Sequence, residues 1–178
     1  MKKSISVLIA LLILTAAAAQ KTGYLNFTTF GILAGTSADD KPAPLSILME
    51  HQYRFSNGLA PGITTGIEQL HENLLPLAVN LKWFLPAGRC EFFMGGLAGY
   101  SVSLEKPDME GIQKATGGIL AGAEIGLLIP VNSGSSVVLA MGYRYNVLHY
   151  ELEDWWVGSY EREETYNRFS IRLGITLY

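Results

Sequence analysis

Apolar and polar residues alternate with a period of two along most of this 178-residue sequence. Residues 74–86 show the pattern most clearly, because nearly every second side chain from Leu75 to Leu85 is large and apolar. Successive side chains of a strand point to opposite faces, so a period of two predicts β-strands. The period of 3.6 that is typical of helices is almost absent after residue 20. The predicted strands span residues 24–35, 45–55, 62–70, 74–86, 90–104, 117–130, 135–148 and 165–178.

The connections between these strands alternate in length, which indicates an up-and-down order. Those after the second, fourth and sixth strands are short and rich in turn residues, as at 56–61. Those after the first, fifth and seventh strands are longer and polar. The first strand is ambiguous in face, and a bulge near Gly31 would reconcile its two halves. We therefore expect an all-β domain of eight antiparallel strands.

Residues 1–19 have the pattern of a cleavable signal peptide. Lys2 and Lys3 precede an apolar run, and small residues follow it up to Ala19. The apolar run is shorter than the roughly 20 residues that a membrane-spanning helix needs. We expect removal of these 19 of the 178 residues to leave one exported domain over residues 20–178. Cys90 is the only cysteine, so no internal disulfide is expected.

The two faces of the predicted strands differ in volume, and this difference favours a membrane barrel over a soluble one. One face carries Leu, Ile, Trp, Tyr and Met side chains, which would overfill the interior of an eight-stranded barrel. The other face is rich in glycine and small residues, which suit a narrow interior and are poor choices for a solvated strand surface. It also carries four acidic and four basic side chains, which we predict to form a closed, ion-paired lumen. The alternative is eight separately solvated surface charges. These residues are Glu50, Arg54, Glu68, Lys82, Glu91, Glu124, Arg144 and Arg172.

Aromatic residues gather near the predicted strand ends, as the interfacial girdles of a membrane barrel do. We expect Tyr53, Phe55, Trp83, Phe84 and Phe92 at the end with the short turns, and Trp155, Trp156, Tyr160 and Tyr166 at the end with the long loops. The last strand must pair with the first, because lipid tolerates no unpaired backbone. Strict alternation along this strand puts Tyr178 on the lumen side.

Together, the signal peptide, the eight alternating strands, the short turns, the longer outer loops and the final aromatic residue resemble the small outer-membrane β-barrel family of Gram-negative bacteria. The resemblance is to the OmpA transmembrane-domain and OmpX type, and it covers residues 20–178 by pattern, with no diagnostic motif. It implies an eight-stranded antiparallel up-and-down transmembrane barrel in the bacterial outer membrane, in contact with membrane lipid and lipopolysaccharide. It also implies that the barrel-assembly machinery recognises the C-terminal strand. We expect a monomer.

Composition and motifs argue against several other classes of protein. The formal net charge is −3 and no basic run occurs, so we expect no nucleic-acid partner. No Gly-rich phosphate loop, metal-ligand spacing or cofactor motif appears, so we expect no cofactor and no metal. His149 lies near Glu151, and Ser159 follows in the next connection, so a catalytic triad can be drawn. Any connection so rich in carboxylates offers such a combination, and we therefore expect no catalytic residues.

The last outer connection, residues 151–164, is the strongest candidate for a contact site. Its six carboxylates and one arginine give a local net charge of −5, with two tryptophans among them. This patch suits a cationic or sugar partner, or divalent ions that bridge to lipopolysaccharide. The plainer alternative is a solvated loop whose tryptophans anchor it at the lipid surface. The candidate residues are Glu151, Glu153, Asp154, Trp155, Trp156, Glu161, Glu163 and Glu164.

The sequence therefore predicts an integral outer-membrane protein with a structural or surface-interaction role, and not an enzyme. Three alternatives stay open. The first is a lipid or peptide hydrolase that uses His149 at the barrel rim. The second is a soluble periplasmic carrier of the lipocalin type, which would turn its large apolar side chains inward. The third is a narrow channel that conducts past Lys82 and Glu124.

Overall fold

The computed structural model describes residues 22–35, 43–70, 72–104, 112–154 and 158–178, with the backbone alone described for 112–116, 151–154 and 158–162. The predicted signal peptide, residues 1–19, lies outside these ranges. Among the described residues, no helix is long and apolar enough to cross a membrane. The strands are β1 (Gly23–Ala34), β2 (Leu45–Arg54), β3 (Leu59–Gln69), β4 (Asn73–Ala87), β5 (Cys90–Ser103), β6 (Ile112–Thr116), β7 (Gly118–Asn132), β8 (Ser135–Asp154) and β9 (Gly158–Leu177).

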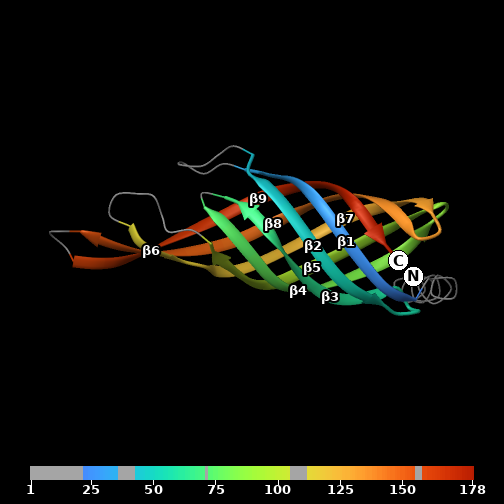
Figure 1. Cartoon of the computed structure of the whole chain (residues 1–178), viewed down its shortest axis with the longest axis horizontal. Helices are drawn as coiled ribbons and strands as arrows, with labels where there is room; N and C mark the ends of the chain where they lie inside the picture. The colour runs from blue at the N-terminus through green and yellow to red at the C-terminus, as the bar shows by residue number, and fades with distance from the viewer. Residues whose placement is uncertain (1–21, 36–42, 71, 105–111, 155–157) are drawn as a thin grey trace, which may run out of the picture.

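These strands form one closed antiparallel barrel (Figure 1). β1 to β5 pair in sequence order, and β5 pairs with β7, β7 with β8, and β8 with β9. The ring closes because β9 also pairs with β1, from Ala34 opposite Phe169 to Asn26 opposite Leu177. The fold predicted from the period-two pattern, an eight-stranded antiparallel barrel, is confirmed.

The short strand β6 does not add a ninth strand to the ring. It pairs with β8 on the same edge that β7 occupies, with Thr116 opposite His149 and Leu120 of β7 opposite Asn146. This pairing slips by one residue at Gly117, so β6 continues the line of β7 beyond a local irregularity. Residues 112–116 were expected to belong to a loop, and the structure corrects this to a strand.

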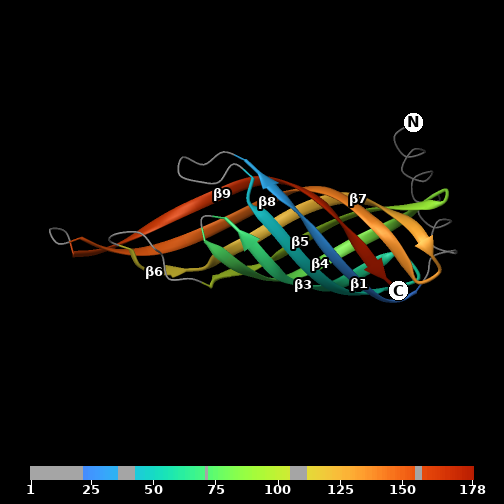
Figure 2. The same cartoon turned by 45° about the horizontal axis from the view of Figure 1, so that its top comes forward.

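β8 and β9 are 20 residues long each and extend well past the other strands in both views (Figure 1, Figure 2). Their ladder runs without interruption from Ser135 opposite Leu177 to Asp154 opposite Gly158. The prediction of an irregular loop over residues 151–164 is therefore wrong for the part that the structure describes. We call this extension, residues 147–154 of β8 and 158–165 of β9, the arm. Leu148 and Tyr150 at the base of the arm are still buried inward residues, and the alternation of apolar and polar residues fades beyond them.

The two faces of the barrel wall separate the side chains as predicted. Large apolar residues lie exposed on the outside, with Phe169 at 66% and Val79 at 65% exposure. The eight predicted lumen charges lie inside the barrel. Arg54 is fully buried, and the side chain of Glu91 is one-fifth exposed. The soluble carrier with inverted faces is therefore contradicted. Strict alternation also holds through Gly31, and β1 pairs continuously with β2, so the proposed bulge is absent there.

Two of the predicted girdle aromatics point into the lumen. Phe84 is fully buried and Tyr166 is 2% exposed, because each occupies an inward position of its strand. Both residues were assigned to the girdle because they lie near strand ends, whereas the period of two places them on the inward face. Tyr53 and Phe55 lie exposed at the short-turn end, which we define as the end with the β2–β3, β4–β5 and β7–β8 turns. Trp155 and Trp156 lie outside the described residues, and the side chain of Tyr160 is not described.

Closure of the ring depends on close approach of β9 to β1 at Gly174. A Cβ atom there would lie 2.7 Å from the Thr29 Cα and would collide with the Thr28 carbonyl oxygen. We expect Gly174→Ala to destabilise the barrel by about 1–3 kcal/mol, because β1 and β9 must move apart. The measurement is the temperature at which the folded band in an SDS gel converts to the unfolded band. Gly134→Ala is the control, since its Cβ would lie 3.7 Å from the Asn132 Oδ1; equal shifts for both variants would contradict the prediction.

Candidate functional site

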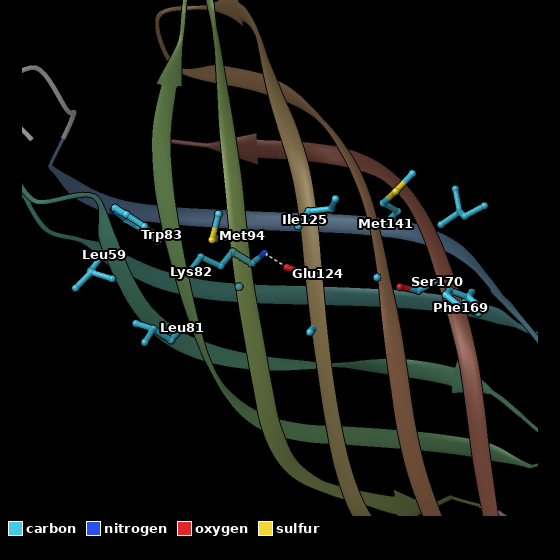
Figure 3. Close-up of a pocket in the computed structure, with 14 residues that line it drawn as sticks. Leu59, Leu81, Lys82, Trp83, Met94, Glu124, Ile125, Met141, Phe169 and Ser170 are labelled. Atoms are coloured by element: carbon cyan, nitrogen blue, oxygen red, sulfur yellow. Dashed lines mark ion pairs between the residues drawn. The ribbon is translucent and has the colours of Figure 1, made fainter. Parts of the chain in front are cut away.

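The centre of the lumen holds a cluster of four ionised side chains from four strands. Lys82 Nζ of β4 lies 2.6 Å from Glu50 Oε2 of β2 and 2.8 Å from Glu124 Oε1 of β7. Arg172 of β9 lies 3.5 Å from Glu50 Oε1 and also pairs with Glu124. Two cations and two carboxylates therefore alternate around a closed cycle, so that each charge has two partners. Figure 3 shows the Lys82 and Glu124 pair across β5.

Gly95 explains how Lys82 and Glu124 meet although a strand separates them. Lys82 is opposite Gly95 on β5, and Gly95 is opposite Glu124 on β7. A Cβ at Gly95 would lie 2.7 Å from the Lys82 Cγ, so the missing side chain leaves the path along which the lysine crosses β5. The lysine ammonium also lies 4.3 Å from the ring centroid of Phe27 and 4.9 Å from that of Phe93. These cation–π contacts further stabilise a buried charge.

The other four predicted lumen charges form two further pairs. Arg144 Nη2 lies 3.1 Å from Glu68 Oε1, and Arg54 donates to both oxygens of Glu91 at 2.8 and 3.1 Å. The structure thus brings all eight predicted residues into ion pairs. Burying a charge is costly unless it is paired and hydrogen-bonded, so this matching is a condition for closing the lumen at all.

The sequence prediction missed two further lumen charges. Arg168 is 1% exposed and donates to the Gly35 carbonyl at 2.8 Å, and Glu72 is 6% exposed and accepts from the Ser103 hydroxyl at 2.6 Å. The period of two had put Arg168 on the polar face of the last strand, so its place was available from the pattern. Glu72 lies between β3 and β4, where alternation gives no signal.

Apolar clusters fill the lumen on both sides of the charged centre. The cluster toward the short-turn end includes three mutually packed rings, with Phe27 and Phe93 at 6.1 Å and Phe84 and Phe93 at 5.8 Å between centroids. Its full membership is Leu25, Phe27, Ala60, Phe84, Phe93, Leu128, Val138 and Ala140, with Tyr178 packed against it. The opposite cluster comprises Leu33, Leu70, Leu74, Leu148, Tyr150 and Tyr166. The expected interior of glycine, small residues and charges was therefore incomplete.

Tyr178 lies at the short-turn end on the lumen side, where strict alternation predicted it. Its hydroxyl lies 2.8 Å from the Ser136 hydroxyl, and the ring packs against the apolar cluster. Burial raises the pKa of the Tyr178 hydroxyl above its usual value, although the hydrogen bond to Ser136 opposes this. The Tyr178 side chain is therefore uncharged.

A small cavity and a large groove lie on opposite sides of the barrel wall. A cavity of about 10 Å³ beside Leu97, Gly122 and Arg144 has room for a single water molecule. A much larger groove, of about 840 Å³, lies on the outer wall and is lined by exposed apolar side chains such as Leu81, Met94 and Phe169 (Figure 3). This groove faces the apolar surroundings of the barrel, so it is no chamber for a polar solute.

The acidic contact patch falls on the arm. Glu151, Glu153, Asp154 and Glu161 belong to the paired backbone of β8 and β9, with side chains outside the described part, and Glu163 and Glu164 are described in full. The exposed side chains of His149 and Glu163 lie 3.6 Å apart. Ser159 is opposite Glu153, four residues beyond His149 on β8. This spacing amounts to about 13 Å along a strand, so the backbone does not bring Ser159 to His149.

Solved structures of outer-membrane proteins have the same fold. OprG from Pseudomonas aeruginosa matches with a TM-score of 0.68 at 11% identity, over 90% of this chain and 97% of that chain. Neisserial surface protein A matches with a TM-score of 0.60 at 13% identity, over 89% and 99% of the two chains. The outer membrane protein AlkL matches with a TM-score of 0.60 at 11% identity, over 90% and 92%. No protein-family model and no curated protein matches the sequence. The chain therefore has the fold of the small eight-stranded outer-membrane β-barrels.

The charged cycle predicts a large penalty for removing one of its members. Lys82→Met leaves two buried carboxylates with one cation between them, and we expect a loss of about 3–5 kcal/mol in the free energy of unfolding. The double variant Lys82→Met with Glu124→Gln should recover part of this loss, because it restores the charge balance.

Urea unfolding in lipid vesicles, followed by the folded band in SDS gels, measures both effects. Arg89→Gln in the exposed β4–β5 turn is the control and should change stability by less than about 0.5 kcal/mol. A Lys82→Met barrel that is as stable as the Arg89→Gln barrel would show that the charged cycle does not contribute to the free energy of unfolding.

Proposed function

We propose that this protein is an integral protein of the bacterial outer membrane, with a closed lumen and a structural or surface-contact role that its arm performs. The observation that carries this proposal is the filled lumen. Ion pairs occupy its centre, and apolar clusters occupy both sides of them. A solute would have to displace paired charges and packed aromatic rings together, which favours a scaffold over a pore.

Three features support the membrane location. Exposed apolar side chains surround the barrel, the fold is that of small outer-membrane barrels, and the turns at one end are short, as periplasmic turns are. Membrane lipid and lipopolysaccharide are then the surroundings of the wall. The barrel-assembly machinery is the expected partner of β9 during insertion, and a monomer is expected because the ring leaves no unpaired edge within the wall.

The arm supports the contact role, because it carries the acidic residues past the end of β1 and along β6. Carboxylates on a projecting hairpin can bind cationic groups, or divalent ions that bridge to the phosphates of lipopolysaccharide. No catalytic step belongs to this proposal, since the triad that could be drawn from the sequence needs Ser159 and His149 together.

A closed lumen predicts that planar lipid bilayers containing the protein show no step conductance. The physical reason is the cost of bringing a hydrated ion past the charged cycle and the two apolar clusters. Neutralising Lys82 or Glu124 separately should not create steps, because the apolar clusters remain in place. Regular steps in the unaltered protein that grow when Lys82 or Glu124 is neutralised would establish the narrow channel instead.

The acidic arm predicts binding that salt weakens. We expect a variant with Glu151, Glu153, Asp154, Glu161, Glu163 and Glu164 changed to amides to lose most of its binding to immobilised polylysine and to calcium-loaded lipopolysaccharide. The comparison variant is Trp155→Ala with Trp156→Ala, which keeps the charge. Surface plasmon resonance at two ionic strengths separates the cases, since screening weakens charge contacts and leaves tryptophan anchoring almost unchanged. Loss of binding in the tryptophan variant alone would favour the lipid-anchor alternative.

A further inference from the structure

A group of four polar side chains lies on the largely apolar outer wall, where β1 meets β2. Tyr24, Asn26 and Thr28 occupy successive outward positions of β1, and His51 is opposite Asn26 on β2. The Thr28 hydroxyl donates to the Asn26 Oδ1 at 3.4 Å, and the Asn26 Nδ2 lies 3.1 Å from the His51 Nδ1. The Tyr24 hydroxyl also hydrogen-bonds to the His51 Nδ1. We call these four residues the wall polar group.

The hydrogen bonds of the wall polar group decide which ring nitrogen of His51 holds the proton. The Asn26 amide turns its oxygen toward the Thr28 hydroxyl and its NH₂ group toward the histidine. A ring nitrogen that faces an NH₂ group must accept, and therefore Nδ1 is unprotonated and Nε2 bears the hydrogen. Among the described residues, no side chain accepts a hydrogen bond from this Nε2–H.

The residues directly opposite His51 and Asn26 on the flanking strands are apolar and cannot satisfy that donor. The neighbour of His51 on β3 is Ile63, which is 58% exposed, and the neighbour of Asn26 on β9 is Leu177, which is 49% exposed. His51 lies three residues before the end of β2, about 10 Å along the strand from the short-turn end. Exposed Tyr24 and Tyr53 lie between it and that end. Exposed tyrosines are typical of the head-group level, so His51 lies just inside that level, next to the acyl chains.

We propose that the wall polar group is a binding site for one glycerophospholipid of the leaflet at the short-turn end. An ester carbonyl or phosphate oxygen of the lipid accepts the hydrogen bond from His51 Nε2–H, and the acyl chains lie along Ile63 and Leu177. Such lipids offer many acceptors at this depth, whereas an unmet donor in an apolar medium is costly. The inference rests on the proposed membrane location, and it adds the ligand class and the residues that hold it.

The first test is native mass spectrometry of the folded barrel, released from octyl glucoside micelles and titrated with dioleoylphosphatidylethanolamine. We expect His51→Phe, which keeps the ring and removes the donor, to weaken lipid binding about three- to tenfold. Tyr143→Phe is the matched control, because it removes another outward hydroxyl, which donates to Asn167 at 2.6 Å. It should leave lipid binding unchanged. Equal lipid binding by His51→Phe and the unaltered protein would overturn the proposal.

A second test uses the unaltered protein and does not depend on folding of a variant. In phosphatidylethanolamine bilayers, ¹⁵N–¹³C and ¹⁵N–³¹P dipolar recoupling should detect the His51 Nε2 next to a labelled ester carbonyl or the lipid phosphate. Absence of both contacts, or a ³¹P contact formed with inorganic phosphate alone in octyl glucoside, would overturn the lipid assignment. Either negative result leaves the conductance and arm-binding experiments unaffected, so failure of this site is distinguishable from failure of the proposed function.

Discussion

The closed ladder of backbone hydrogen bonds is the constraint on which the rest of this structure depends. Once β9 pairs with β1, every strand of the eight-membered ring has both edges paired, and each side chain of the ring faces either the lumen or the surroundings. The period of two therefore becomes an assignment of environment, residue by residue. An exposed Val79 and a fully buried Arg54 would each be unfavourable in a soluble domain. In the closed ring, Val79 suits the apolar surroundings and Arg54 suits the ion-paired lumen.

Inside the ring, volume and charge limit each other. Eight strands leave a lumen that side chains can fill, and the chain fills it with a charged cycle between two apolar clusters. Gly95 permits one of these ion pairs, because its missing side chain leaves the space through which Lys82 reaches Glu124. Because the lumen is filled, the two proposed contact sites lie outside it: the arm is at one end of the barrel, and the wall polar group is near the other. Both are places where polar groups occur although closure does not require them.

Much of this architecture was readable from the sequence, for a physical reason. Lipid outside and a narrow lumen inside impose opposite demands on alternate residues, so the pattern is strong wherever both are present. The strand faces, the eight lumen charges and the inward direction of Tyr178 all follow from it. The prediction of strands failed where one of the two environments was missing. Residues 112–116 and 151–164 lie beyond the wall, and there the paired backbone of β6 and of the arm leaves no period of two to detect.

The sequence by itself determined the class of fold and the side of the wall on which each residue lies, because these depend on a local repeat. Only the tertiary structure decided the partners. Whether Lys82 meets Glu50, Glu124 or both depends on strand register and on a glycine in a strand between them. The contact of Asn26 with His51 likewise joins residues whose order along the chain carries no signal. Pairing is a property of the closed ring: a period of two excludes a slip of one residue between strands, but it does not say which pair of residues meets.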